Sequence, residues 1–199
     1  EYFLKDGRLI STLFCYLGGI LHLPIPAYII AMDFLGMIFL AISIYIISKI
    51  FIDIIKPENK KKEILIYLAS FVLILNQYTL EYLLFPESAV MCLGVLFNVI
   101  AIKFMVDNPK CKYIKIFSAL LVAVFCYQGV LNMFPVLAIL VYIVKQILDK
   151  REYKVKEKEF FVEMIKLAFI VIVVLAICYE EFSEEQLVFK GDTLYMLVY

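Results

Sequence analysis

The sequence predicts an all-α polytopic membrane protein with about six transmembrane helices and one helix in the outer interface. Three observations support this fold class: the hydrophobic content, the length of the apolar segments and the one-sided placement of basic residues. Of the 199 residues, 64% are hydrophobic, whereas soluble proteins contain about 45–50% apolar residues. A soluble chain would have to expose much of this excess to water. A lipid bilayer accepts apolar surface and removes that cost.

Six apolar segments are predicted to cross the membrane, because a spanning helix needs roughly 20 largely apolar residues. The fourth segment is short and corresponds to only ~23 Å of helix at 1.5 Å per residue. It either joins the fifth across a tight turn near Gly129 or belongs to a tilted pair. The six predicted spans are 27–52, 64–84, 88–106, 114–128, 130–148 and 160–179.

The ends of the chain are predicted to lie outside the membrane core. Residues 1–8 form an outer loop, and the apolar stretch 9–23 is too short for a span and ends at Pro24. Since proline stops helices, we expect 9–23 to be a helix in the outer interface. Residues 180–199 form a second outer segment. The chain begins with Glu1 and not with Met, so we expect it to be part of a longer protein.

Lysine and arginine placement predicts the orientation. With these six spans, 16 of the 19 basic residues fall on one face, chiefly in the loops 56–62, 103–115 and 145–158. Only Lys5, Arg8 and Lys190 fall on the other face, which is rich in acidic residues. The basic loops are therefore predicted to be cytoplasmic, and both ends of the chain to lie outside.

Several function classes lack support in the sequence. Walker A, GxGxxG, HExxH and GxSxG motifs are absent, and the basic residues sit at membrane edges and not in a nucleic-acid-binding pattern. The five cysteines form no CxxC pair, and His22 is the only histidine. A zinc site needs clustered Cys or His ligands, so no metal-ligating residues are predicted.

Ionisable residues inside or beside apolar segments are the first site candidates. Asp33 lies about six residues into the first predicted span, where a charge is costly unless it faces a polar cavity or a partner. It either reaches water from the helix end or lines an outward-open cavity. Asp6 and Arg8 flank a glycine ahead of the interfacial helix. Arg8 would either bind a substrate phosphate or anchor the chain to lipid headgroups.

Polar residues also gather at the outer ends of the second and fourth spans. Gln77 and Glu81 are four residues apart and share a helix face, while Glu87 precedes the third span, where an acid suits the helix dipole. That dipole explains Glu87 alone, but not the gathering of three polar residues at one edge. Tyr127 and Gln128 end the fourth span. Amides in lipid need hydrogen-bond partners, so Gln128 either makes a hydrogen bond between helices or contacts a substrate.

Three segments resemble one family of membrane glycosyltransferases. They are KDGRLISTLF, LEYLLFPESAVMCLGVL and FCYQGVLNMF. In this order they resemble segments of the Gtr-type (GtrII-like) glucosyltransferases, which decorate O-antigen and other bacterial surface polysaccharides. The resemblance covers most of the chain. It implies a GT-C-like fold in the bacterial inner membrane, with a catalytic pocket on the outer face.

The resemblance also implies partners and residue roles. The donor would be a polyprenyl-phosphate sugar, usually undecaprenyl-phosphate glucose, and the acceptor a surface glycan or its lipid-linked precursor. Asp6, Glu81 and Glu87 would be the catalytic acids. The family's own acidic pair lies shortly upstream of the GR segment, at a position before Glu1, so Asp6 stands as its substitute. No cofactor is firmly implied, although a divalent metal is compatible. Arg8, Gln77, Tyr127, Gln128 and Asp33 would bind substrate.

Two other functions remain open on the sequence alone. One is a transporter or flippase of a lipid-linked sugar, and the other is a non-catalytic membrane partner in envelope glycan assembly. Transporters place polar groups near the bilayer midplane, often in repeated halves. Here the polar residues crowd the outer edge and no repeat is found, which favours an enzyme.

Overall fold

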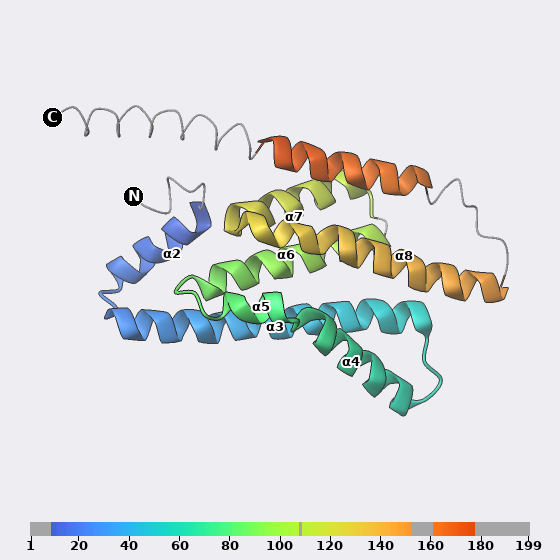
Figure 1. Ribbon diagram of the computed structural model, residues 1–199, viewed down its shortest axis with the longest axis horizontal. Coiled ribbons are helices and arrows are strands. Elements are labelled where there is room, and N and C mark those ends of the chain that lie inside the picture. Colours follow the sequence, from blue (N-terminus) through green and yellow to red (C-terminus); the bar gives the residue numbers. More distant parts are fainter. Residues whose placement is uncertain (1–8, 108, 153–160, 178–199) are drawn as a thin grey trace.

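The computed structural model describes residues 9–107, 109–152 and 161–177, and within these ranges every regular element is a helix. Most of the helices run roughly along one axis, whereas the first and third described helices are inclined to it (Figure 1). In order they are α2 (Leu9–Ile20), α3 (Ile25–Ile55), α4 (Lys60–Ile74), α5 (Gln77–Tyr82), α6 (Ser88–Asp107), α7 (Lys112–Cys126), the 3-10 helix η1 (Gln128–Asn132), α8 (Met133–Glu152) and a last helix over 161–177.

Helix α6 forms the centre of the bundle and packs mainly against α3 and α7. Glycines permit these close approaches because a Cβ would occupy the space of a neighbour. A Cβ on Gly36 would lie 3.4 Å from the backbone nitrogen of Ala89, and one on Gly94 would lie 2.8 Å from Val130 Cγ2. Helix contacts made through small residues are typical of membrane bundles, where hydrophobic burial does not drive association.

A tight reversal joins α2 to α3. His22 has a positive φ of 49°, and its backbone nitrogen donates to the carbonyl of Gly19. Pro24 then adopts extended geometry as the N-cap of α3, and a proline stands in the first turn, where the missing N–H costs nothing. The predicted interfacial segment 9–23 is thus a helix that ends at Ile20, followed by this turn.

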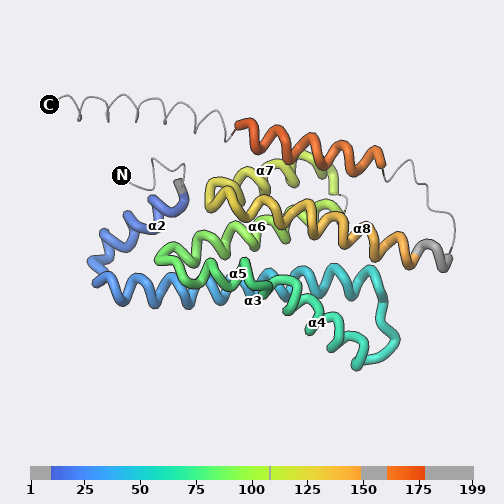
Figure 2. Tube along the Cα trace, in the orientation of Figure 1, coloured from blue at the N-terminus to red at the C-terminus, as the bar shows by residue number. Residues whose placement is uncertain are grey.

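The two ends of the bundle differ in charge. One end holds the α3–α4 connection, the α6–α7 connection and the last turns of α8 (Figure 2). We call it the lysine-rich end, after Lys56, Lys60, Lys61, Lys62, Lys110, Lys112 and Lys115. The opposite end holds α2, the first turns of α3 and α6, and η1. The predicted gathering of the loops 56–62 and 103–115 at one end is therefore observed, while the last part of the loop 145–158 lies outside the described residues.

The expected six spans are not confirmed. Three helices in the described part of the chain are long and apolar enough to cross a membrane: Ile25–Ile55, Ser88–Asp107 and Gln128–Leu148. These three indicate a membrane protein. Helices α4 and α7 have 15 residues each, about 23 Å of helix.

The prediction of one continuous helix over 64–84 is wrong. Helix α4 ends at Ile74, and Leu75 has non-helical backbone angles. Asn76 then starts α5, because its side-chain oxygen accepts a hydrogen bond from the Thr79 backbone nitrogen at 3.1 Å. This is the usual capping interaction of asparagine at a helix start, and it ends the apolar run.

The join between the fourth and fifth predicted segments is also resolved. Tyr127 is extended, and the next five residues form η1, which leads directly into α8. A 3-10 helix repeats every three residues. Gln128 and Asn132 are four apart and so do not share a face there.

Candidate active site

Two carboxylates are held by serine hydroxyls where α2, α3 and α6 meet. Ser11 Oγ donates to Glu87 Oε2 at 2.8 Å, and Ser88 Oγ donates to Asp33 Oδ1 at 2.7 Å. Since Glu87 and Ser88 are consecutive, the two bonds adjoin. We call these four residues the serine–carboxylate cluster.

The start of α6 places Glu87 in this cluster. Its backbone carbonyl accepts hydrogen bonds from the nitrogens of Val90 and Met91, at 2.9 and 3.2 Å, so Glu87 is the residue from which α6 begins. A carboxylate there is stabilised by the helix dipole. The preceding Pro86 cannot donate to a helical ladder and separates α5 from α6. Glu87 therefore lies at the start of a helix, as the sequence suggested, and its side chain also accepts a hydrogen bond from α2.

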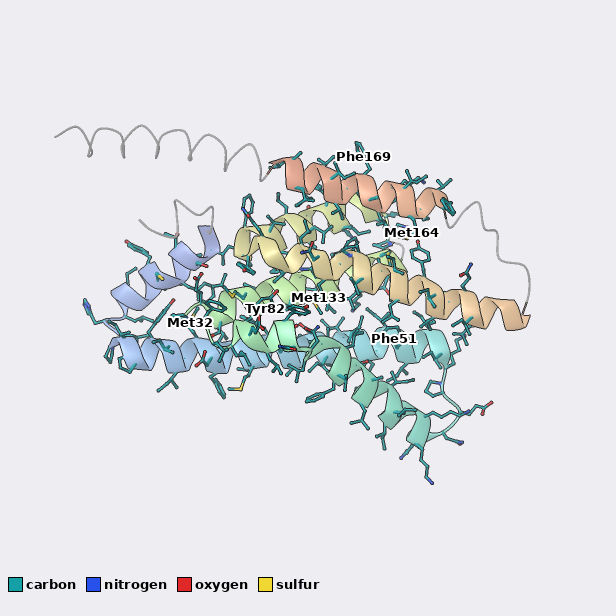
Figure 3. The ribbon with its side chains drawn as sticks, in the orientation of Figure 1. Met32, Phe51, Tyr82, Met133, Met164 and Phe169 are labelled. Carbon is teal, nitrogen blue, oxygen red and sulfur yellow. The ribbon has the colours of Figure 1, made fainter. Side chains whose placement is uncertain are left out.

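Three of the four cluster residues are buried, and Asp33 is partly buried. Glu87 is 8% exposed, Ser11 1% and Ser88 0%. Around the cluster lies a small apolar core of Met32, Ala89, Val90 and Cys126, and Figure 3 labels Met32 on α3 at this end. Buried acids are costly unless they are hydrogen-bonded. The serine hydroxyls supply bonds of this charge-assisted kind.

A tyrosine of α3 adds a further hydroxyl beside the cluster. Tyr28 Oη lies 3.6 Å from Cys15 Sγ on α2. Its ring also fills the space beside Gly18, where a Cβ would meet ring carbons at 2.7 and 2.9 Å. Gly18 therefore lets α2 lie close against the first turn of α3, and this packing keeps Ser11 near α6.

Several other predicted site residues lie at the surface. Gln77, Glu81 and Gln128 are exposed, and no hydrogen bond joins Glu81 or Gln77 to the cluster in the described part of the chain. Tyr127 instead packs edge-on against Tyr82, with ring centroids 5.7 Å apart and planes at 73°. The structure thus joins the α7–η1 corner to α5 through two aromatic rings. Asp6 and Arg8 lie outside the described residues.

Sequence reasoning missed four residues here: Ser11, Ser88, Tyr28 and Tyr82. A buried serine in an apolar run offers only a weak signal, because serine also bonds to its own helix backbone. Ser43 and Ser48 of α3 do this, donating to Phe39 and Ile44 carbonyls. The position of Ser88 directly after Glu87 was visible, but the partner of its hydroxyl was not.

In the described ranges, a metal site built from side chains alone would need several ligands close together. No group of three or more His, Cys, Asp or Glu side chains there could hold an ion. The arrangement offers instead a buried, oriented carboxylate with hydroxyl neighbours. A group of this kind can accept a proton from a substrate hydroxyl.

The chain matches a known protein family. The sequence model of the family described as Glucosyl transferase GtrII matches residues 5–181. This range includes every residue of the serine–carboxylate cluster and all three segments on which the resemblance rested. No curated protein and no solved structure matches the chain, so the GT-C-like fold stays a prediction.

Proposed function

The chain belongs to the GtrII glucosyl transferase family, and on this premise we propose that it transfers glucose from a polyprenyl-phosphate donor to a surface glycan. The acceptor is a hydroxyl of a cell-surface polysaccharide or of its lipid-linked precursor. The reaction takes place at the end of the bundle that holds the serine–carboxylate cluster, on the outer face of the bacterial inner membrane.

Glu87 is the proposed general base. The acceptor hydroxyl attacks the glucose C1, the bond from C1 to the phosphate oxygen breaks, and the hydroxyl proton passes to the Glu87 carboxylate. The polyprenyl phosphate leaves with the bonding electrons. A carboxylate has about four acceptor sites, so an acceptor hydroxyl can share it with Ser11. The observation that carries this role is the 2.8 Å bond from Ser11, which orients a buried acid.

Asp33 is proposed to bind the sugar. Its Oδ1 accepts from Ser88, the residue next to Glu87, and it is only partly buried. A second carboxylate near the base can hold a glucose hydroxyl. Gln77, Tyr127 and Gln128 remain proposed substrate contacts. Glu81, which the sequence suggested as a catalytic acid, is now proposed as a further substrate contact because it is exposed.

Arg8 is proposed to bind and stabilise the leaving phosphate. A guanidinium gives a phosphate two parallel donors, and it stabilises charge that develops as the bond to C1 breaks. Arg8 precedes Ser11 by three residues in the sequence, and Ser11 is bonded to the proposed base. Asp6 is the alternative acid in the same leading segment.

The outer-face assignment rests on charge. The connections rich in lysine lie at one end of the bundle, and the cluster lies at the opposite end. Cytoplasmic loops carry the excess of basic residues. A lipid-linked donor in the outer leaflet would then reach the cluster from the bilayer.

The proposal is tested by a choice of donors. Membranes containing the protein are given acceptor glycan with labelled polyprenyl-phosphate glucose or, separately, with labelled nucleotide-linked glucose. We expect glycan labelling only from the lipid-linked donor. Labelling from the nucleotide donor, in membranes unable to make the lipid-linked sugar, would contradict the donor class, and no labelling from either donor would contradict the function.

A further inference from the structure

A second feature lies far from the serine–carboxylate cluster, between α7 and the helix 161–177. Two adjoining hollows share Tyr113, Phe169 and Ile170, and their volumes are about 390 and 230 Å³. Figure 3 labels Phe169 on the helix 161–177. The larger volume falls within the range of small-molecule sites, about 300–1,000 Å³. We call the two hollows together the α7 groove.

The α7 groove is apolar along its length and has a cation at one end. Lys166 lines the larger hollow, while Phe117 and Val173 line the smaller one. From residue 166 to residue 173 a helix rises about 10 Å. The groove therefore runs along the helix axis from the lysine-rich end toward the middle of the bundle. An acyl chain in a bilayer lies in the same direction as the helices.

No described carboxylate forms an ion pair with Lys166, the lysine at the end of the groove. Glu163 is the nearby acid, but it already accepts from Lys112 Nζ at 3.2 Å and from Tyr113 Oη at 2.9 Å. The Nζ of Lys166 lies 5.4 Å from the centre of the Tyr113 ring. Among the described residues, the Lys166 charge therefore has no carboxylate partner beside the groove.

We propose that the α7 groove binds an anionic glycerophospholipid of the leaflet at the lysine-rich end. The phosphate would lie on Lys166, and one acyl chain would fill the hollow between Tyr113 and Val173. Basic pockets between transmembrane helices bind anionic headgroups on the cytoplasmic side. The proposal is independent of the glucosyl transfer site, which lies at the other end of the bundle.

The test compares two lipids with the same acyl chains. Purified protein, stripped of lipid in detergent, is titrated with phosphatidylglycerol or phosphatidylcholine, and bound lipid is counted by native mass spectrometry. We expect wild-type protein to prefer phosphatidylglycerol. Lys166→Gln is expected to lower its affinity for phosphatidylglycerol about fivefold, the effect of one lysine at an anionic surface, and to leave phosphatidylcholine binding unchanged.

A matched control comes from α3. Lys49 also lies over a tyrosine, with its Nζ 5.8 Å from the Tyr45 ring centre, but it lines neither of the two hollows. Lys49→Gln is expected to keep the wild-type preference. Ile170→Trp, which fills the shared wall of the hollows, is expected to lower binding of both lipids.

Three results would overturn the proposal. One is an unchanged preference in Lys166→Gln, and another is an equal loss in Lys49→Gln, which would indicate general surface charge. The third is stronger retention of a polyprenyl phosphate than of phosphatidylglycerol in the same titration, since the occupant would then belong to a different lipid class.

Discussion

Ser11 donates a hydrogen bond to Glu87 across 76 residues of sequence, with the two side-chain oxygens 2.8 Å apart. The bond joins the first described helix to the start of the central helix α6. Both residues are buried, so the contact is shielded from water. It connects the position of α2 to the orientation of the proposed base.

Removing the Ser11 hydroxyl should cost both stability and activity. A hydrogen bond to a charged group contributes about 1.5–3 kcal/mol, so we expect Ser11→Ala to lower the free energy of unfolding by about 1–3 kcal/mol and to reduce kcat. Ser11→Thr keeps the hydroxyl and should restore kcat. Thermal unfolding in detergent and initial transfer rates measure the two effects. Equal kcat in Ser11→Ala and wild type would remove the orienting role.

The break between α4 and α5 should depend on the Asn76 side chain. Asn76→Ala loses the cap to Thr79 and should destabilise the protein by about 1 kcal/mol. Asn59 is a matched control, because it stands at the start of α4 without a side-chain cap bond. Asn59→Ala should change the unfolding midpoint much less. A larger loss in Asn59→Ala than in Asn76→Ala would contradict this explanation of the break.

The close packing at Gly94 gives a test of the bundle core. A Cβ there would lie 2.8 Å from Val130 Cγ2 and 3.2 Å from the Ala123 carbonyl oxygen, so Gly94→Ala should cost about 1–3 kcal/mol through overpacking. Gly19 of α2 has no neighbour within 4 Å. There, alanine should be neutral or stabilising, since it is the better helix former. Chemical or thermal unfolding measures the stability of both variants. A Gly94→Ala variant as stable as Gly19→Ala would contradict the α6–α7 packing.

The orientation of the bundle can be tested with two turn positions of similar geometry. His22 and Cys111 both have positive φ, 49° and 60°, both are exposed, and they lie at opposite ends. In a variant without other cysteines, His22→Cys should react with a membrane-impermeant thiol reagent added outside the cell. Cys111 as the sole cysteine should react only after the membrane is opened. The reverse pattern would place the serine–carboxylate cluster in the cytoplasm.

The elements that the sequence predicted well are those whose apolar run ends at a clear signal. Helix α6 begins at Ser88 and ends at Asp107, within one residue of the predicted 88–106, because Pro86 precedes it and charged residues follow it. The segment 64–84 was predicted as one helix, with the polar residues from Asn76 to Glu81 placed at its outer end and not at a break. The cap to Thr79 reveals the break. A side-chain hydrogen bond of this kind favours the start of a new helix over continuation of the old one, and composition does not show that it forms.

The sequence identified the two acids of the site but not their hydrogen-bond partners. Asp33 and Glu87 were noticeable separately, since an acid in an apolar segment is costly without a partner. Their partners, Ser88 and Ser11, depend on how α2, α3 and α6 pack, and that packing depends on Gly36 and Gly18. Glu81 was grouped with Glu87 through sequence proximity. The short helix α5 and the turn after it leave Glu81 exposed instead.

The most direct test of the proposed chemistry is the initial rate of glucosyl transfer by Glu87→Gln with labelled polyprenyl-phosphate glucose. Glutamine keeps the shape of the side chain and can still accept from Ser11, but it cannot take a proton. Loss of a general base costs about 100- to 10,000-fold in rate, so we expect kcat to fall by at least about 100-fold, with the unfolding midpoint close to that of the wild type. Glu58→Gln, at an exposed acid near the lysine-rich end, should transfer at the wild-type rate. A Glu87→Gln protein that is folded and transfers glucose as fast as the wild type would contradict the account.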